Sequence, residues 1–224
     1  MRIIVLAAMA MAASYLSAAA QTAPRQLSAQ ELIADFDAKL ARGEDAAAAI
    51  GEMYGRDQYL RSVIIAEMHQ PMSEATRHVL LTGVQHHFDR IDGDNTRRLK
   101  AILDHMSWEE LSALTPQTAN EAFTLISHSP DHEFQRRMVA IFEPLARAGS
   151  VPGDYVALLA DDLAQGDGRP QVYGTNWDCI NGVFQPMPTE DMAHIEQRRA
   201  DMHLSTFAEY SAQQRQLYGD CPPR

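Results

Sequence analysis

The sequence lacks the short motifs that mark the commonest hydrolase, nucleotide-binding and zinc-protease sites. It has no Gly-x-Ser-x-Gly, no phosphate-binding glycine loop and no His-Glu-x-x-His. It also has only two cysteines, which cannot form a structural zinc site without further ligands. These absences exclude the usual signatures of those classes, and we expect no metal and no other cofactor.

Positive charge is scarce as well. The chain has 19 lysine and arginine residues against 30 aspartate and glutamate residues, and Lys39 and Lys100 are its only lysines. The formal net charge of −11 argues against nucleic acid and anionic membrane surfaces as partners, because both would be repelled. This charge fits a soluble protein of the periplasm or the cell exterior.

A long apolar run occurs only at the start of the chain. Arg2 precedes this run, and Ala18-Ala19-Ala20 offers a small-x-small cleavage site ahead of Gln21. The pattern predicts a secretory signal peptide over residues 1–20, followed by a single helical domain over residues 21–224. An uncleaved membrane anchor is the alternative, since the run is barely long enough to span. We therefore expect an exported protein, periplasmic or extracellular, with no membrane contact after cleavage.

Helix signals, in contrast, are abundant. Ser28-Ala29-Gln30-Glu31 is a capping box that opens an amphipathic run to about Arg42. Asp92-Gly93-Asp94-Asn95 is interpreted as a turn and N-cap between two later helices. Capping residues, prolines and apolar periodicity predict the other helices over about 45–69, 73–90, 130–149, 152–166, 189–203 and 205–218, with shorter ones from Asp94, Ser107 and Thr115.

The composition changes between Arg169 and Pro188. Asn181-Gly182 stands there between apolar flanks, and this pair is the strongest short signal for a hairpin because both turn positions need positive φ. We predict one small β-hairpin near residues 170–186. The fold class is then mainly α, an irregular array of about nine or ten helices with this hairpin inserted late.

Asp57 interrupts the apolar face of the predicted helix over residues 45–69, between Met53 and Leu60. A buried carboxylate is costly unless it is paired, and Arg61 lies one turn away at i+4. The pair is either an internal structural bridge or part of a polar cavity. In both cases we predict that Asp57 is buried and paired with an arginine, either Arg61 or Arg199.

Arg199 breaks a second apolar stripe, which runs from Met192 to Met202, and Arg198 lies beside it. A buried guanidinium can hold a carboxylate in two-point contact. That carboxylate belongs either to a ligand or to the protein itself, as an internal ion pair.

His128 stands at the end of a predicted helix, directly before Ser129-Pro130. A histidine there can act as an acid or base near neutral pH, or it can cap the carbonyls of the helix that it ends. Further along, Tyr173 and Thr175 present hydroxyls on one face of a predicted strand. These hydroxyls either meet a ligand or pack against the helices.

Cys179 and Cys221 are alone in the chain. An even number of cysteines in an oxidising compartment predicts a disulfide, which would pin the chain end to the hairpin. Two free thiols, one of them reactive, are the alternative.

Several blocks of sequence carry a resemblance to a known family. The most specific block is Gln171-Val172-Tyr173-Gly174-Thr175, which follows Gly168-Arg169-Pro170. The others are Tyr54 to Gln58 with Arg61, Asn95 with Leu99 to Ile102, Trp108, His128 with Phe134-Gln135, and Pro188 to Asp191 with Arg198-Arg199. Together, from about Met53 to Tyr210, they resemble an uncharacterised bacterial family, domain of unknown function 6624.

The chain departs from the pattern of this family at two places. Members usually show Gly-Trp-Pro where the chain has Ser107-Trp108-Glu109, and Asp-Pro where it has Pro130-Asp131. The resemblance implies no activity. It does point to the residues that break the helical pattern, which are Asp57, Arg61, His128, Tyr173 and Arg199.

Two classes of function fit these residues. The leading hypothesis is a binding module whose polar pocket holds a small anionic ligand or a peptide. Its ligand-binding residues would be Arg61, Arg198 and Arg199, with Gln135, Tyr173 and Thr175 as orienting partners. The alternative is a hydrolase-type enzyme with His128 as general base, oriented by Asp57 or Asp131. Water would then attack, because no serine or cysteine nucleophile is marked out.

Both hypotheses expect residues from distant segments to meet. We predict that His128, Gln135, Tyr173 and Arg199 approach one another around a common pocket.

Overall fold

The structure of the protein is a computed structural model, and it describes residues 28–219 and Cys221. The predicted signal peptide and its cleavage site lie outside the described residues. The chain divides into two compact units, residues 1–44 and 45–224. Among the helices of the described part, none is long and apolar enough to cross a membrane.

The described part of the first unit is the beginning of helix α2, Ala29–Met68. The predicted capping box is confirmed, because the Ser28 N–H donates to the Glu31 carboxylate at 2.8 Å and the Glu31 N–H donates to the Ser28 hydroxyl at 3.2 Å. The predicted break after Arg42 is wrong, since α2 continues through Gly43. A helical glycine costs only about 1 kcal/mol relative to alanine, and the alanines that follow favour the helix.

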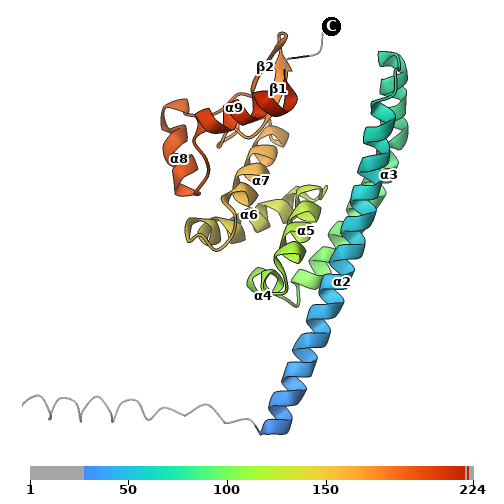
Figure 1. Cartoon of the computed structure of the whole chain (residues 1–224), viewed down its shortest axis with the longest axis vertical. Helices are drawn as coiled ribbons and strands as arrows, with labels where there is room; N and C mark the ends of the chain where they lie inside the picture. Colours follow the sequence, from blue (N-terminus) through green and yellow to red (C-terminus); the bar gives the residue numbers. More distant parts are fainter. Residues whose placement is uncertain (1–27, 220, 222–224) are drawn as a thin grey trace, which may run out of the picture. The chain divides into compact units, whose positions relative to one another are not determined.

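The second unit contains the rest of α2 and seven further α-helices (Figure 1). These are α3 (Glu74–Leu103), α4 (Trp108–Ser112), α5 (Pro116–Ser127), α6 (His132–Arg147), α7 (Gly153–Gly166), α8 (Ile195–Asp201) and α9 (Phe207–Tyr218). The described residues therefore hold eight α-helices, not the predicted nine or ten. The number is lower because α2 and α3 each join two predicted helices into one.

Asp92-Gly93-Asp94-Asn95 lies inside α3 and is not a turn with an N-cap. Side chains of this segment are held by α2 instead. Asp92 pairs with Arg61 at 3.1 Å, and the Asn95 amide nitrogen donates to the Met53 carbonyl at 3.4 Å. If this segment were an N-cap, its side chains would bind backbone N–H groups of the following helix. They bind α2 instead, and these contacts favour the continuous helix.

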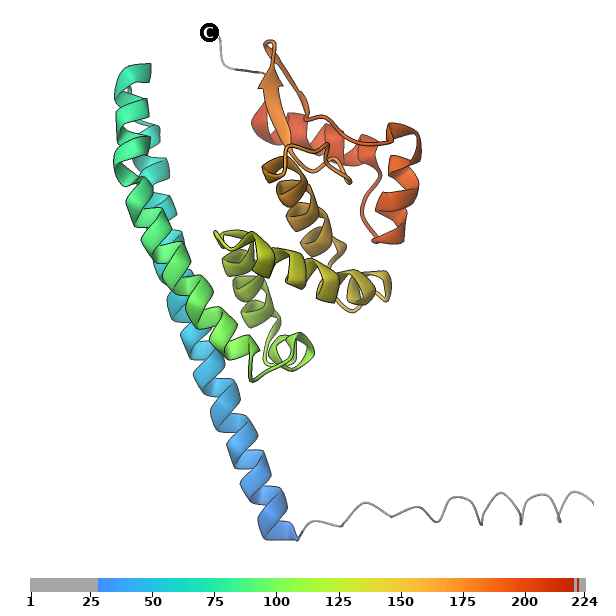
Figure 2. The same ribbon diagram turned by 180° about the vertical axis from the view of Figure 1, so that it is seen from behind.

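The core of the second unit contains a cluster of aromatic rings among aliphatic side chains. The rings of Phe123 and Tyr155 stack with centroids 3.8 Å apart, and Trp108 meets Phe142 edge-on at 4.6 Å. All four side chains are buried. Helices α5, α6 and α7, which lie against one another (Figures 1 and 2), supply three of them. This packing holds α5 and α7 against α6. His128 lies at the end of α5 and Asp161 lies on α7.

The predicted hairpin is confirmed in a shorter form. Strand β1, Trp177–Ile180, pairs antiparallel with β2, Val183–Pro186. Asn181 and Gly182 form the turn with φ values of 54° and 81°. The strands do not extend back to residue 170, because the Gln171 side chain holds that segment by donating to the carbonyls of Asn176 and Met187, each at 3.0 Å.

The predicted helix over residues 189–203 is reduced to a 3-10 turn, η1 (Met192–His194), and α8. Asp191 adopts a left-handed conformation with φ 37°, which no α-helix can include. The backbone before it is paired with Gln171, whose N–H donates to the Pro188 carbonyl and whose carbonyl accepts from the Glu190 N–H, each at 2.9 Å.

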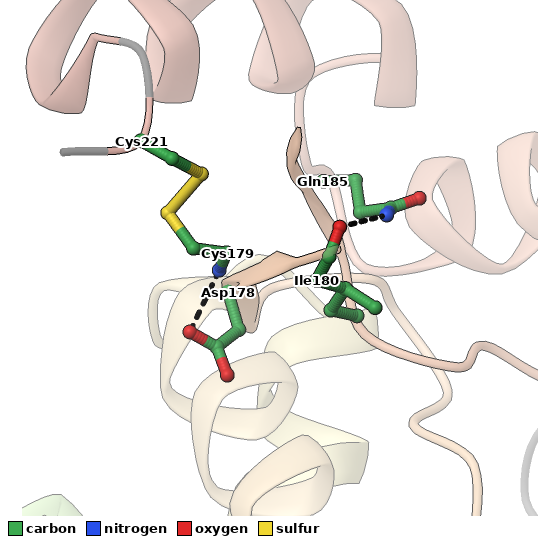
Figure 3. Close-up of a disulfide and its surroundings, with 5 residues drawn as sticks. All are labelled: Asp178, Cys179, Ile180, Gln185 and Cys221. Atoms are coloured by element: carbon green, nitrogen blue, oxygen red, sulfur yellow. Dashed lines mark hydrogen bonds between the residues drawn. A yellow bond between two sulfur atoms is a disulfide. The ribbon is translucent and has the colours of Figure 1, made fainter. Parts of the chain in front are cut away.

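A disulfide joins Cys179 to Cys221, as predicted, with Cα atoms 5.7 Å apart (Figure 3). It links β1 to the segment that follows α9. The Cys179 N–H donates to the Asp178 carboxylate at 2.7 Å, and the Gln185 amide donates to the Ile180 carbonyl across the hairpin at 3.1 Å. The disulfide therefore ties Cys221 to β1, and the side chains of Asp178 and Gln185 add hydrogen bonds within the hairpin.

Replacing both cysteines by serine is expected to lower the free energy of unfolding by about 2–4 kcal/mol. The reason is that the bridge restricts a segment of 42 residues in the unfolded chain. Urea unfolding without reductant measures the loss. Wild-type protein unfolded in reductant is the control, and it should match the double variant. Equal stability of the oxidised wild type and the double variant would contradict the prediction.

Candidate functional site

Asp57, on α2, is the most enclosed acidic group of the site, with its side chain fully buried. Three side chains donate to its carboxylate. Arg61 Nη1 lies 2.6 Å from Oδ1, Gln58 Nε2 lies 2.7 Å from Oδ2, and His128 Nδ1 lies 2.9 Å from Oδ1. The prediction that Asp57 is buried and paired with an arginine is confirmed, with Arg61 as the partner.

Arg61 is shared between two carboxylates. Besides Asp57 on its own helix, it binds Asp92 on α3 through both terminal nitrogens, at 3.3 and 3.1 Å. Its guanidinium also lies over the Phe88 ring, 5.3 Å from the centroid. Two carboxylates thus share one guanidinium, so the cluster can accommodate a proton on His128 without an uncompensated positive charge.

The pKa values of the two carboxylates shift in opposite directions. Burial alone would raise the pKa of Asp57, but the hydrogen bond and charge of His128, with the Arg61 charge and the Gln58 hydrogen bond, outweigh burial and lower it. Burial raises the pKa of Asp92, because the contact with Arg61 does not offset it. Asp57 is therefore ionised at neutral pH and only accepts hydrogen bonds.

His128 presents its ring to this carboxylate from the end of α5. Nδ1 lies 2.9 and 3.1 Å from the two oxygens of Asp57. Because an ionised carboxylate only accepts, Nδ1 must carry the proton, and the lone pair of the neutral ring is then on Nε2. The side chain is 28 % exposed, so part of the ring reaches solvent. This is the arrangement of a histidine oriented by a buried carboxylate.

His128 is the C-cap residue of α5, as one of its two predicted roles states, and its backbone N–H donates to the carbonyls of Thr124 and Ile126. Its ring binds Asp57 instead of helix carbonyls, and the side chain of Gln135 on α6 adds two hydrogen bonds to the end of the helix. Gln135 Nε2 donates to the carbonyls of Ile126 and Ser127 at 3.1 and 3.0 Å. Gln135 thereby fixes the last turn of α5, which carries His128, and its amide nitrogen is already occupied by the protein.

The lowered pKa of Asp57 predicts a pH-dependent contribution to stability. A carboxylate whose folded pKa lies below its unfolded value of about 3.9 stabilises the fold above that value. The contribution is lost as the pH falls through the folded pKa. The destabilisation caused by Asp57→Asn is therefore expected to be present at about pH 5 and to shrink below about pH 4. Urea unfolding of both proteins over this range measures it, and a constant penalty in acid would refute the assignment.

Asp161, on α7, is a second fully buried carboxylate, which sequence reasoning missed. It accepts hydrogen bonds from the N–H groups of Val172, Tyr173 and Thr175 and from the Thr175 hydroxyl, all between 2.6 and 2.9 Å. The sequence does carry a signal. Asp161 lies at i+4 from Ala157 on an otherwise apolar face, as Asp57 does on α2.

Asp161→Ala is expected to lower the free energy of unfolding by about 2–3 kcal/mol, because buried N–H groups of the loop lose their acceptor. Thermal and urea unfolding measure the change. Asp89→Ala is the matched control, since Asp89 is exposed and accepts only from Gln85, and it should change stability by no more than about 0.5 kcal/mol. Equal effects of the two variants would show that Asp161 does not hold the loop.

Asp162 is the next residue of α7. It accepts a hydrogen bond from the Asn176 amide at 2.7 Å. Burial raises the pKa of Asp162, against the bond from Asn176; the charge of Asp161 raises it further and the charge of His128 lowers it. The carboxylate of Asp162 is therefore within electrostatic range of the imidazole.

Arg199 binds backbone carbonyls. It is 1 % exposed, and it donates from Nη1 to the Tyr173 carbonyl and from Nε to the Ser205 carbonyl, each at 2.7 Å. The internal ion pair expected as one alternative for Arg199 is wrong, because no carboxylate in the described part of the chain pairs with it. Burial lowers the pKa of Arg199, as expected for a cation without a counter-charge.

Arg198 has a similar role at the same loop. It donates to the carbonyls of Val172, Asp191 and Glu190 at 2.9, 3.0 and 2.7 Å. Its guanidinium also lies 3.8 Å from the Asp191 carboxylate. Both arginines therefore brace the loop and the segment after the hairpin.

The four residues predicted to share a pocket fall into two groups. Within the described residues, no hydrogen bond joins His128 or Gln135 to Tyr173 or Arg199. Gln135 binds the carbonyls of Ile126 and Ser127 at the end of α5, next to His128, and Arg199 binds the Tyr173 carbonyl. Helix α7 binds the loop of the second group through Asp161.

A family model described as "Family of unknown function (DUF6624)" matches residues 54–221 of the chain. The match includes Asp57, His128, the loop of residues 171–175 and both cysteines. Neither the curated proteins nor the solved structures gave a match. In the described ranges, no group of three or more His, Cys, Asp or Glu residues could hold a metal ion.

Proposed function

The chain belongs to the DUF6624 family of unknown function, and since membership names no activity, we propose one from the site: hydrolysis by water, with His128 as general base and Asp57 as the residue that positions it. The observation that carries the proposal is the contact of His128 Nδ1 with the fully buried carboxylate of Asp57. A buried carboxylate that fixes the tautomer and direction of an accessible imidazole is the arrangement that general-base catalysis requires.

The chemistry begins with a water molecule beside Nε2. As the water oxygen bonds to an electrophilic carbon or phosphorus of the substrate, its proton passes to Nε2. Asp57 stabilises the imidazolium that forms. The imidazolium then returns the proton to the leaving group, whose bond breaks with the electron pair staying on the leaving atom. One water is consumed, and the neutral histidine is restored.

Asp57 is the better of the two carboxylate partners offered by the sequence. The Asp131 carboxylate binds Lys100 at 2.7 Å and the Phe134 N–H at 2.9 Å, as the N-cap of α6. The Asp131 carboxylate is therefore already used to cap α6 and to bind Lys100. Asp57, buried and with a lowered pKa, does not itself take the substrate proton, so its part is to orient the ring and to balance its charge.

Anion binding by an exported module is the second candidate. The observation in its favour is Arg199, whose buried guanidinium has only carbonyl and hydroxyl partners and a Tyr210 ring 4.8 Å away among the described residues. An anion would compensate this charge. The guanidinium is almost completely buried, so an anion from solvent has little access to it, which makes this candidate the weaker one.

A hydrolysis screen tests the proposal. Chromogenic esters, phosphodiesters and anilides are offered to the wild type, to His128→Gln and to His194→Gln. The last variant is the matched control, because His194 also binds a carboxylate, Asp191 at 2.8 Å, but is 73 % exposed. We expect at least one substrate to be hydrolysed by the wild type and by His194→Gln only. Activity that His128→Gln retains, or inactivity of the wild type on every class, would eliminate this function.

A further inference from the structure

A cleft of about 420 Å³ lies between the hairpin and helices α7 and α9. Figures 1 and 2 show the hairpin beside α9. We call it the aromatic cleft, after the residues that matter most in its lining: Asn176, Trp177, Phe184, Tyr210, Gln214 and Tyr218. None of these belongs to the His128 site, although Asn176 also binds Asp162.

Aromatic rings run in series along this cleft. Trp177 on β1 and Phe184 on β2 have centroids 5.5 Å apart, and Phe184 and Tyr218 at the end of α9 have centroids 5.8 Å apart. Tyr218 is 69 % exposed, so most of its ring is open to a ligand. The cleft therefore offers apolar ring surfaces, tilted against one another, from the hairpin to the exposed Tyr218.

Polar groups beside these rings are available for hydrogen bonds. The Gln214 amide and the Tyr218 hydroxyl have no hydrogen-bond partner within the part of the chain that the structure describes. The Tyr210 hydroxyl donates to the Thr175 carbonyl at 2.9 Å and keeps its lone pairs for a donor. A ligand of this cleft thus has both apolar faces and hydroxyl or amide groups.

The lining also restricts the charge of the ligand. No residue of the aromatic cleft is ionised at neutral pH, and burial raises the pKa of Tyr210 further above its ordinary value. Arg215 lies over the Trp177 ring, 5.3 Å from its centroid, which disfavours a cation. The chain as a whole carries a net charge of −11, which disfavours an anion. Because the lining offers no counter-charge to an ionised group, a neutral ligand is favoured.

We propose that the aromatic cleft binds a neutral saccharide. The C–H faces of a pyranose ring pack on aromatic rings, and its hydroxyls exchange hydrogen bonds with amide and phenol groups. The cleft volume lies in the range of about 300–1,000 Å³ typical of small-molecule sites. This inference goes beyond the hydrolysis proposed above and does not depend on it, because binding needs no proton transfer at His128.

The disulfide has a part in this site. Cys179 lies two residues after Trp177, and Cys221 lies three residues after Tyr218. The bridge, drawn in Figure 3, therefore ties the strand that carries Trp177 to the segment that follows Tyr218. Reduction of the bridge is expected to weaken saccharide binding while the helices α5 to α7 stay folded.

Tryptophan fluorescence of the full chain tests the proposal. The chain has two tryptophans, and Trp108 is only 2 % exposed, so a ligand-dependent change reports on Trp177. The probes are the neutral trisaccharides of glucose and of N-acetylglucosamine. We expect a saturable change, with the dissociation constant raised roughly three- to tenfold by Tyr218→Ala, as for loss of one aromatic contact.

Three further variants locate the binding. Tyr59→Ala is the matched control, because Tyr59 on α2 is 73 % exposed and far along the sequence from the cleft, and it should leave binding unchanged. Gln214→Ala should weaken binding without removing a ring. His128→Gln should bind as the wild type does, which separates this proposal from the proposed hydrolysis. Circular dichroism confirms that each variant is folded.

Several outcomes would overturn the proposal. One is the absence of a saturable signal with both trisaccharides. Another is equal binding by Tyr218→Ala and Tyr59→Ala, which would place the ligand elsewhere. A proline-rich peptide that binds where neither sugar does would assign the cleft to peptides instead.

Discussion

Asp57→Ala is expected to lower the free energy of unfolding by about 3–5 kcal/mol, the cost of removing one partner of a buried ion pair. The substitution takes away the acceptor of three donors, Arg61, Gln58 and His128. It leaves the Arg61 guanidinium, which is 21 % exposed, with Asp92 as its remaining carboxylate. Equilibrium urea unfolding at neutral pH measures the loss.

Asp191→Asn is the control for this experiment, because asparagine tolerates the left-handed backbone at this position, where φ is 37°. Asp191 also binds a histidine, His194, at 2.8 Å, and lies 3.8 Å from Arg198, but its side chain is 56 % exposed. An exposed pair contributes little, so the change should stay within about 0.5 kcal/mol. If Asp57→Ala were as mild as Asp191→Asn, Asp57 would be solvated and the positioning role proposed for it would fail.

Local rules of sequence predict much of this fold. The capping box at Ser28, the Asn181-Gly182 turn and the disulfide each depend on residues whose preference is set by their own backbone or by a lack of other partners. Asp57 belongs to the same class, because a carboxylate on an apolar stripe must find a cation, and Arg61 is one turn away. All four are confirmed.

Contacts between distant segments are not predictable in this way. His128 is 71 residues from Asp57, and no periodicity states that the end of α5 packs against the middle of α2. The same limit explains the error at Asp92 to Asn95. A local reading favours a turn there, but Arg61 and Met53 of α2 engage the side chains and keep α3 continuous.

The partners of Arg199 illustrate a further limit. A sequence shows that a guanidinium lies on an apolar stripe, and it suggests a carboxylate as the partner. It does not show which backbone carbonyls are left without donors when loops replace regular structure. The segment of residues 171–176 is such a loop, and the carbonyl of Tyr173 is one of those that Arg199 satisfies.

His128→Gln is expected to lower kcat/KM by about 10²- to 10⁴-fold on any substrate that the protein hydrolyses, the usual contribution of a general base. Glutamine can still donate from its amide to Asp57, so the buried carboxylate keeps a donor at this place. It offers no nitrogen that accepts a proton from water. The variant is therefore expected to remain far more stable than Asp57→Ala while losing activity.

The dependence of activity on pH separates catalysis from a structural role. A general base works only in its unprotonated form, so wild-type activity should rise as the pH is raised from acid. The residual activity of His128→Gln should lack that rise, whereas His194→Gln should keep it. A His128→Gln variant whose pH profile has the wild-type shape, or whose activity falls only in proportion to its loss of folded protein, would show that His128 serves the fold and that another group activates the water.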